Sequence, residues 1–257
     1  MARRADGSAG DADYGRIGAG YTNFRQPEPV IAQRIEEMLG SAHSILNVGA
    51  GAGSYEPRGQ NLTAVEPSAS MRAQRPAELP QAIDATAEAL PFADDSFDAA
   101  MASFTIHQWR DLEQGLSEMR RVTRGPIVIL SCDPQRVCDF WLNDYAPDVL
   151  ATEARRYPSL ERITETLGHT TQALPVPIPL HCRDGFNEAY FGRPEMLLLE
   201  GARQANSAWS FVAPDIVSTA VAALKAAIES GAWDTRHGHL RDQPFYDGSL
   251  RLFVAQG

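Results

Sequence analysis

A glycine-rich segment follows a short apolar run and is the part of the chain best suited to bind a ligand through its backbone. The run Ser44–Val48 leads directly into Gly49-Ala50-Gly51-Ala52-Gly53. Glycine lets backbone amides approach a ligand closely, because no Cβ stands in the way. The dinucleotide fingerprint requires Gly or Ala where Ser54 stands, and no Gly-Lys-Ser/Thr triphosphate motif is present. The alternative is a strand-to-helix turn that uses glycine for structural reasons alone.

Two acidic residues follow the next apolar segments at positions suited to a nucleoside. Glu66 comes directly after the apolar run 62–65, and a carboxylate at the carboxyl end of a second strand can accept both hydroxyls of a ribose. Asp84 follows the apolar Ile83, where its carboxylate can accept the exocyclic amine of an adenine. The alternative for Asp84 is a helix cap before Ala85, which by itself is the commoner role.

The first half of the chain alternates short strand patterns with amphipathic helix patterns. This alternation predicts βαβ units and a parallel sheet covered on both faces. We expect helices over Pro27–Leu39 and 112–122, and strands over Ser44–Val48, Leu62–Val65, Gln81–Ile83, Phe97–Ser103 and Pro126–Ser131.

The second half has a different composition, since the segment from Asp133 to about Ala213 is richer in proline and aromatic residues. Within it, the segment 176–180 is expected to be an edge strand interrupted by proline. Residues 215–230 have the spacing of an amphipathic helix that ends at Gly231, and residues 250–254 predict a terminal strand.

Five motifs follow one another in order between residues 14 and 132, over about half of the chain. They are Val48–Gly53, Val65–Ser68 with Met71, Asp84-Ala85 with Leu90–Phe92, Ser96–Asp98, and Glu118–Val122. In this order they resemble the class I S-adenosylmethionine-dependent methyltransferases, in particular the small-molecule group that includes the ubiquinone/menaquinone-biosynthesis methyltransferases.

The resemblance implies a set of residues that bind S-adenosyl-L-methionine. The glycine loop would lie against the methionine part, Glu66 would bind the ribose, and Asp84 with Ala85 would face the adenine. An amino-terminal Tyr…Tyr…Arg pattern would cover the cofactor, and its guanidinium fork matches the methionine carboxylate. The alternative for that arginine is a solvated residue before the first helix. The full predicted cofactor-binding set is Tyr14, Tyr21, Arg25, Gly49, Ala50, Gly51, Gly53, Glu66, Asp84, Ala85 and Ser103.

Two positions depart from the pattern of the family. Asn47 stands where the family commonly has an acidic residue, so it offers no charge to the cofactor's ammonium group. A single imidazole, His107, stands where many relatives have a His-His pair. His107 is the candidate general base, because an unperturbed imidazole titrates near neutrality. The alternative is a structural histidine hydrogen-bonded to the backbone.

Composition limits the partners. With 23 Lys+Arg against 33 Asp+Glu, the net charge is −10, and binding to nucleic acid or a membrane surface is not expected. No export signal and no apolar run of bilayer length are visible, and Cys132, Cys138 and Cys182 form no C-x-x-C motif, so we expect a cytoplasmic protein. No metal site is expected, and the thiols leave arsenite methylation as a remote alternative.

These features predict a single α/β domain with a doubly wound, mostly parallel, seven-stranded Rossmann-like sheet and an inserted helical cap. The expected boundaries are a tail at 1–13, a cofactor-binding core at 14–132, an aromatic-rich cap at 133–213 over the acceptor pocket, and a final helix and strand at 214–257. The expected function is methyl transfer from S-adenosylmethionine to a small organic molecule, whose identity and methylated atom cannot be read from the sequence. Alternatives are a cofactor-binding protein that does not methylate, as a sensor or rearrangement catalyst, and a nicotinamide-dependent oxidoreductase. No oligomeric state is predicted.

Overall fold

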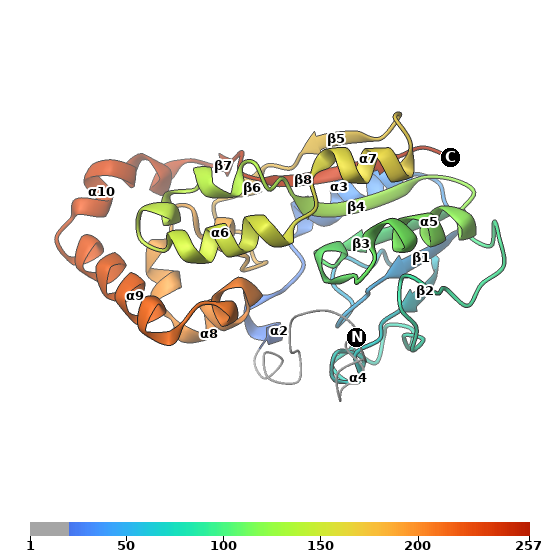
Figure 1. The fold of residues 1–257 in the computed structure, drawn as a ribbon, viewed down its shortest axis with the longest axis horizontal. Coiled ribbons are helices and arrows are strands. Elements are labelled where there is room, and N and C mark those ends of the chain that lie inside the picture. The colour runs from blue at the N-terminus through green and yellow to red at the C-terminus, as the bar shows by residue number, and fades with distance from the viewer. Residues whose placement is uncertain (1–20) are drawn as a thin grey trace.

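The computed structural model describes residues 21–257. The predicted tail, Tyr14 and the side chain of Tyr21 therefore lie outside the described residues. A sheet flanked by helices forms one lobe of the molecule, and a second, mainly helical lobe lies beside it (Figure 1). The chain passes from the first lobe to the second after the fourth strand of the sheet.

The central sheet has six strands in the order β2-β1-β3-β4-β8-β5. The first four strands in this order are parallel, and β8 is antiparallel to both of its neighbours. A separate two-stranded sheet pairs β6 with β7. The strands are β1 (Ser44–Val48), β2 (Asn61–Val65), β3 (Ala99–Ser103), β4 (Ile127–Cys132), β5 (Gln172–Pro175), β6 (Ile178–Pro179), β7 (Phe245–Tyr246) and β8 (Leu250–Ala255).

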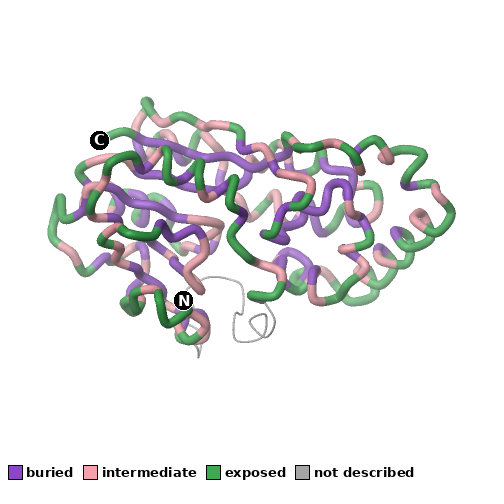
Figure 2. Tube along the Cα trace, turned by 180° about the vertical axis from the view of Figure 1, so that it is seen from behind, coloured by how far each residue is buried: buried purple, intermediate pink, exposed green. Residues whose placement is uncertain are grey.

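Successive side chains along each strand point to opposite faces of the sheet, and each face is covered by its own layer of helices. Val128 and Leu130 of β4 pack on the face covered by α3 (Pro29–Leu39). Ile127 and Ile129 pack on the other face, against α5 (Leu112–Val122) and α7 (Leu160–Leu167). Every residue of β4 is buried, as expected for a parallel strand covered on both sides, and Figure 2 shows the strands buried along most of their length.

The two helices that flank the first strands are capped by the residues that the sequence places at their ends. Glu28 accepts the Val30 N–H at the start of α3, Pro29 takes the first helical position, and Gly40 ends the helix with a φ of +61°. Asp111 accepts the Gln114 N–H at 2.9 Å and begins α5. These caps hold the helices in register with the strand ends that they precede or follow.

The sheet has six strands instead of the predicted seven. The segment Gln81–Ile83 contributes a single parallel bridge, in which Ile83 exchanges hydrogen bonds with Ala64 and Glu66. Pro80 precedes it, Ile83 is 40% exposed, and the chain turns at Asp84, so the segment is too short to extend the ladder. The other predicted strands and helices of the sheet lobe lie within two residues of their predicted bounds.

The division of the chain also differs from the predicted boundaries. Helix α7 and strand β5 fall inside the predicted cap, yet α7 packs against α5 and β5 pairs with β8 in the central sheet. Conversely, α9 (Pro214–Glu229), predicted to complete the core, packs in the second lobe. That lobe also contains α6 (Pro147–Arg156), α8 (Glu200–Gln204) and α10 (Ala232–His237), while α2 (Tyr21–Phe24) and α4 (Ala69–Arg72) lie near the open end of the sheet.

Among residues 21–257, no helix combines the length and the apolar character needed to span a membrane.

Candidate cofactor site

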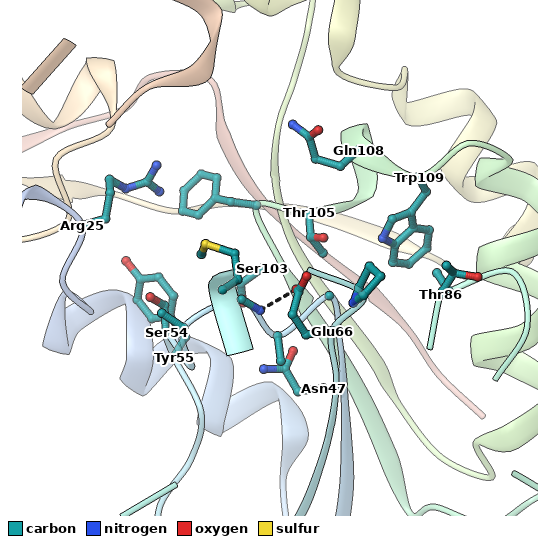
Figure 3. Close-up of a pocket in the computed structure, with 18 of the residues that line it drawn as sticks. Arg25, Asn47, Ser54, Tyr55, Glu66, Thr86, Ser103, Thr105, Gln108 and Trp109 are labelled. Atoms are coloured by element: carbon teal, nitrogen blue, oxygen red, sulfur yellow. Dashed lines mark hydrogen bonds between the residues drawn. The ribbon is translucent and has the colours of Figure 1, made fainter. Parts of the chain in front are cut away.

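A cleft opens at the carboxyl ends of β1, β2 and β3, where ligands bind in open α/β sheets. It contains about 940 Å³ of empty space, part of it open to solvent, and is lined by the glycine loop, the end of β2 and residues 86–88, 103–105 and 108–109. Figure 3 shows Arg25 and Trp109 on opposite sides of the cleft, with Glu66 between them. Six predicted cofactor-binding residues line it: Arg25, Gly49, Ala50, Gly51, Glu66 and Ser103.

The glycine loop turns sharply because its glycines adopt conformations that other residues rarely reach. Gly49 and Gly51 have φ values of +71° and +52°. The amides of Gly49 and Ala50 both donate to the Val65 carbonyl at 2.9 Å, which anchors the loop to the end of β2. A Cβ on Gly49 would lie 2.1 Å from Thr105 Oγ1, so glycine is also required there by the neighbouring segment.

Glu66 links the two strand ends that form the cleft. Its Oε2 accepts the Gly51 N–H and its Oε1 accepts the Ser68 N–H, each at 2.8 Å. Burial raises the pKa of the Glu66 carboxyl, while these two amides and the guanidinium groups of Arg72 and Arg75 oppose the rise. Each carboxylate oxygen retains acceptor capacity, since it has two lone-pair directions, so the group can also receive hydroxyls from a ligand.

Two buried polar atoms lining the cleft have no hydrogen-bond partner among the described residues. They are Asn47 Oδ1 and Ser103 Oγ, at the ends of β1 and β3. Buried polar atoms are almost always paired, so an acceptor and a hydroxyl left unpaired in a cleft fit a ligand that carries donors. The ammonium group of a methionine moiety is such a donor. The residues present therefore fit S-adenosylmethionine.

The charge that the sequence lacks at Asn47 is present nearby. Glu56 Oε1 accepts the Asn47 Nδ2–H at 3.0 Å, and Glu56 Oε2 pairs with Arg75 at 2.8 Å. The side chains of Glu56 and Arg75 are 0% and 4% exposed. Arg75 also donates to the Gly51 carbonyl, so this ion pair supports the glycine loop from beneath.

Arg25 reaches the cleft but has a carboxylate partner of its own. Its Nε and Nη2 donate to Asp184, which is 2% exposed and also accepts the Tyr55 hydroxyl at 2.7 Å. Burial raises the pKa of the Tyr55 hydroxyl, and the Asp184 carboxylate adds to the effect. The guanidinium group also lies over the Phe104 ring, 5.0 Å from its centroid. Asp184 carried no sequence signal, because it is 159 residues from Arg25.

The opposite end of the cleft is formed by Thr86, Ala87, Glu88 and Trp109 rather than by Asp84 and Ala85. Asp84 points away and forms an ion pair with Arg72 at 3.4 Å, with its side chain 51% exposed. The Ala85 amide is turned back to the Ile83 carbonyl, and Gly53 packs beneath the loop, where a Cβ would lie 2.2 Å from Leu79. Asp84, Ala85 and Gly53 therefore do not line the cleft, because the chain turns earlier than a full third strand would allow. Trp109 gave no sequence signal beyond its position after β3.

His107 lies outside the cofactor cleft, in a second cavity beside it. This cavity has about 490 Å³ of empty space and shares Arg25 and Phe104 with the first. Phe104 has a φ of +51°, a strained conformation for a phenylalanine. The backbone conformation of Phe104 turns the chain, so that Ser103 lines the cofactor cleft and His107 lines the second cavity. The His107 ring packs edge-to-face against Tyr157, with 4.8 Å between centroids.

Within the part of the chain that the structure describes, no group of three or more His, Cys, Asp or Glu side chains is arranged to hold a metal ion.

The parallel sheet, the glycine loop after β1, the carboxylate after β2 and the unpaired atoms in the cleft form a site that fits S-adenosyl-L-methionine, and the arrangement is similar to that of class I S-adenosylmethionine-dependent methyltransferases. The family model described as "Methyltransferase domain" matches residues 46–126. This range holds the end of β1, all of β2, β3 and α5, and every strand end that lines the cleft.

Three known proteins illustrate the similarity. Malonyl-[acyl-carrier protein] O-methyltransferase of Pseudescherichia vulneris is 31% identical over 121 residues, which cover 44% of this chain and 48% of that protein. The crystal structure of a putative methyltransferase from an antibiotic biosynthesis pathway of Anabaena variabilis is 29% identical, with a TM-score of 0.82 over 90% of this chain and 98% of that chain. The [4+2]-cyclase SpnF shares the fold, with a TM-score of 0.55 and 14% identity over 95% of this chain and 92% of that chain.

The chain spans about half the length of the curated relatives it matches.

Proposed function

We propose that this protein transfers the methyl group of S-adenosylmethionine to a small organic acceptor. The observation that carries the proposal is the joint arrangement of Glu66, the glycine loop and the two unpaired atoms Asn47 Oδ1 and Ser103 Oγ around one cleft. A sulfonium cofactor supplies an activated methyl group, and its leaving group is neutral. The protein therefore has mainly to position the two reactants, which can lower the barrier by about 7–11 kcal/mol.

The residues that line the cleft have separate roles in this proposal. Backbone groups of Gly49–Gly51, with Asn47 Oδ1 and Ser103 Oγ, hold the methionine part. Glu66 accepts the ribose hydroxyls, and Trp109 with residues 86–88 encloses the adenine. Arg25 holds the methionine carboxylate while remaining paired with Asp184. Tyr14 and Tyr21 stay proposed cover residues, outside the described side chains, and Asp84, Ala85 and Gly53 act by supporting the loops.

The acceptor is proposed to enter the second cavity, because that cavity adjoins the cleft at Arg25 and Phe104 and is lined by His107. The net charge of −10 disfavours a nucleic acid. A cytoplasmic location is supported by the three cysteines, all of which are free thiols.

Calorimetry and a product assay together test this function. Titration with S-adenosylmethionine and S-adenosylhomocysteine should show saturable binding of both, and incubation with a productive acceptor should release S-adenosylhomocysteine in step with methylated product. Binding without release across a broad acceptor panel would favour a non-methylating role. Preferential binding of a nicotinamide cofactor would overturn the assignment.

A further inference from the structure

The second cavity has an unusual lining for a site beside a methyl donor, because it combines charged side chains with aromatic walls. Phe104 and Phe186 face each other with ring centroids 5.4 Å apart, and Tyr157 packs against His107. Glu153 and Arg156, one turn apart on α6, supply a carboxylate and a guanidinium group. The cavity therefore places charged and polar groups between aromatic side chains.

Glu153 is held in place by a defined chain of hydrogen bonds. Its Oε2 accepts the Asn187 Nδ2–H at 2.7 Å, and Asn187 Oδ1 accepts the Trp209 Nε1–H at 3.0 Å. The indole can only donate, so it fixes the amide with its NH₂ toward Glu153. The carboxylate is therefore oriented by residues of the second lobe, and it lines the cavity beside Tyr157, with which it also forms a hydrogen bond.

Charge in the cavity distinguishes between acceptor chemistries. Two guanidinium groups, those of Arg25 and Arg156, line it together with the single carboxylate of Glu153. Because Asp184 already pairs with Arg25, the stabilisation of an acceptor oxygen that develops negative charge is assigned to the guanidinium group of Arg156. The flat aromatic walls favour a ring, since offset and edge-to-face contacts add to the apolar area that is buried.

We propose that this cavity is the acceptor site, that Glu153 takes the proton of the acceptor, and that the acceptor is a small aromatic hydroxyl compound. The proposal rests on the proposed methyltransferase function. In the reaction, the acceptor oxygen forms a bond to the methyl carbon and the carbon–sulfur bond breaks with its electron pair going to sulfur. The hydroxyl proton passes to the Glu153 carboxylate, so charge and atoms balance.

The surroundings of Glu153 suit a proton acceptor. Burial raises the pKa of the Glu153 carboxyl, and the amide of Asn187 and the nearby arginines limit the rise. A carboxyl whose pKa is moved toward neutrality is a better general base than an ordinary one. The groups that influence it from neighbouring elements are Arg25, Arg156, Tyr157, Cys132 and Glu188.

The test compares Glu153→Gln, His107→Gln and the matched control Glu161→Gln, an exposed carboxylate on α7. Glutamine can still accept from Asn187, so the fold should survive, and thermal melting checks this. The probes are p-cresol and catechol, with 4-methylanisole, benzylamine and a malonyl thioester as contrasting acceptors. Binding is measured by calorimetry with S-adenosylhomocysteine present, and turnover by release of S-adenosylhomocysteine.

We expect the two phenols to bind and to be methylated, and the contrasting acceptors to be inert. Glu153→Gln should lower kcat by roughly 100-fold or more and remove the acidic limb of the pH profile, with the Kd for S-adenosylhomocysteine changed less than twofold. His107→Gln should lower kcat less than tenfold, and Glu161→Gln should leave it unchanged.

Three results would overturn the inference while leaving the methyltransferase function standing. In the first, the cofactor binds but the phenols neither bind nor react. In the second, the amine or the thioester is methylated while the phenols are inert. In the third, Glu153→Gln turns over as fast as the wild-type protein. Failure of the wild-type protein to bind S-adenosylmethionine would instead defeat the proposed function itself.

Discussion

Glu56 fixes which way the amide of Asn47 faces. Its Oε1 accepts the Asn47 Nδ2–H at 3.0 Å in a site where Glu56 is fully buried. A carboxylate only accepts hydrogen bonds, so the NH₂ group must face Glu56 and the carbonyl oxygen Oδ1 must face the cofactor cleft. The family that the sequence resembles led us to expect an acidic residue at the position of Asn47. This chain keeps the carboxylate nine residues later and uses an oriented amide to present an oxygen to the cleft.

Asn47→Asp should therefore be harmful, although it restores the acid found in the family. Two carboxylates would face each other across about 3 Å in a buried site that has one guanidinium partner, Arg75. We expect the free energy of unfolding to fall by about 1–3 kcal/mol and cofactor affinity to fall with it. Chemical denaturation and calorimetry measure both quantities.

A double-mutant cycle isolates this interaction from any general damage. Combining Asn47→Asp with Glu56→Gln removes the repulsion and should recover most of the lost stability, because the glutamine NH₂ can donate to the new carboxylate. Tighter cofactor binding in the Asn47→Asp single variant, with unchanged stability, would show that Glu56 does not set the orientation.

Glu66→Ala should weaken binding of S-adenosylhomocysteine by tenfold or more. The substitution removes the proposed ribose acceptor and also leaves the amides of Gly51 and Ser68 without their partner. A hydrogen bond to a charged group is worth about 1.5–3 kcal/mol. Glu66→Gln should show a smaller loss, and Glu78→Ala, an exposed carboxylate nearby, should show none. Equal affinity in Glu66→Ala and the wild type, measured by calorimetry, would remove Glu66 from the site.

Gly49→Ala should disrupt the cleft through Thr105 and not through a ligand. A Cβ at this position would lie 2.1, 2.8 and 2.9 Å from three atoms of the Thr105 side chain, and no rotation of that side chain clears all three. The positive φ adds roughly 1–2 kcal/mol of strain. We expect loss of cofactor binding together with a lower melting temperature.

Thr105→Gly provides the matched rescue for Gly49→Ala, since it removes the atoms that clash. The melting temperature of the double variant should lie between those of Gly49→Ala and the wild type, because the backbone strain at residue 49 remains. A double variant no more stable than Gly49→Ala would contradict the steric explanation.

The features that the sequence predicted best are those that depend on a few neighbouring residues. Strand ends follow from apolar runs, so the position of Glu66 at the end of β2 could be predicted from its neighbours alone. The resemblance predicts Asp84 at the adenine end, after a third strand that closes at Ile83. That segment forms only a single bridge, and the Asp84 carboxylate is turned outward to Arg72. Asp184 and Glu153 come from the second lobe and meet the cleft region only through tertiary packing. Nothing in their local sequence signals those contacts.

Glu188 should make the stability of the protein depend on pH in a defined window. This carboxyl is 6% exposed and accepts the amide and hydroxyl of Ser249. Burial, with a smaller contribution from the Glu153 carboxylate, raises the pKa of Glu188 to about 7, although the hydrogen bonds from Ser249 and the charge of Arg251 oppose the rise. The folded state thus favours the protonated form more than the unfolded state does. This contribution to stability is complete below pH 4.5 and is lost as the pH rises through 7.

Glu188→Gln keeps a neutral polar group at this position at every pH and should remove that dependence. The difference in unfolding free energy between the variant and the wild type should grow in favour of the variant by up to about 3 kcal/mol between pH 5 and pH 8, since one pH unit corresponds to about 1.4 kcal/mol. Urea denaturation at several pH values measures it, with the exposed Glu165→Gln as the control. A difference that stays constant across this range would mean that Glu188 is ionised in the folded protein throughout, and that the amide and hydroxyl of Ser249 outweigh the effect of burial.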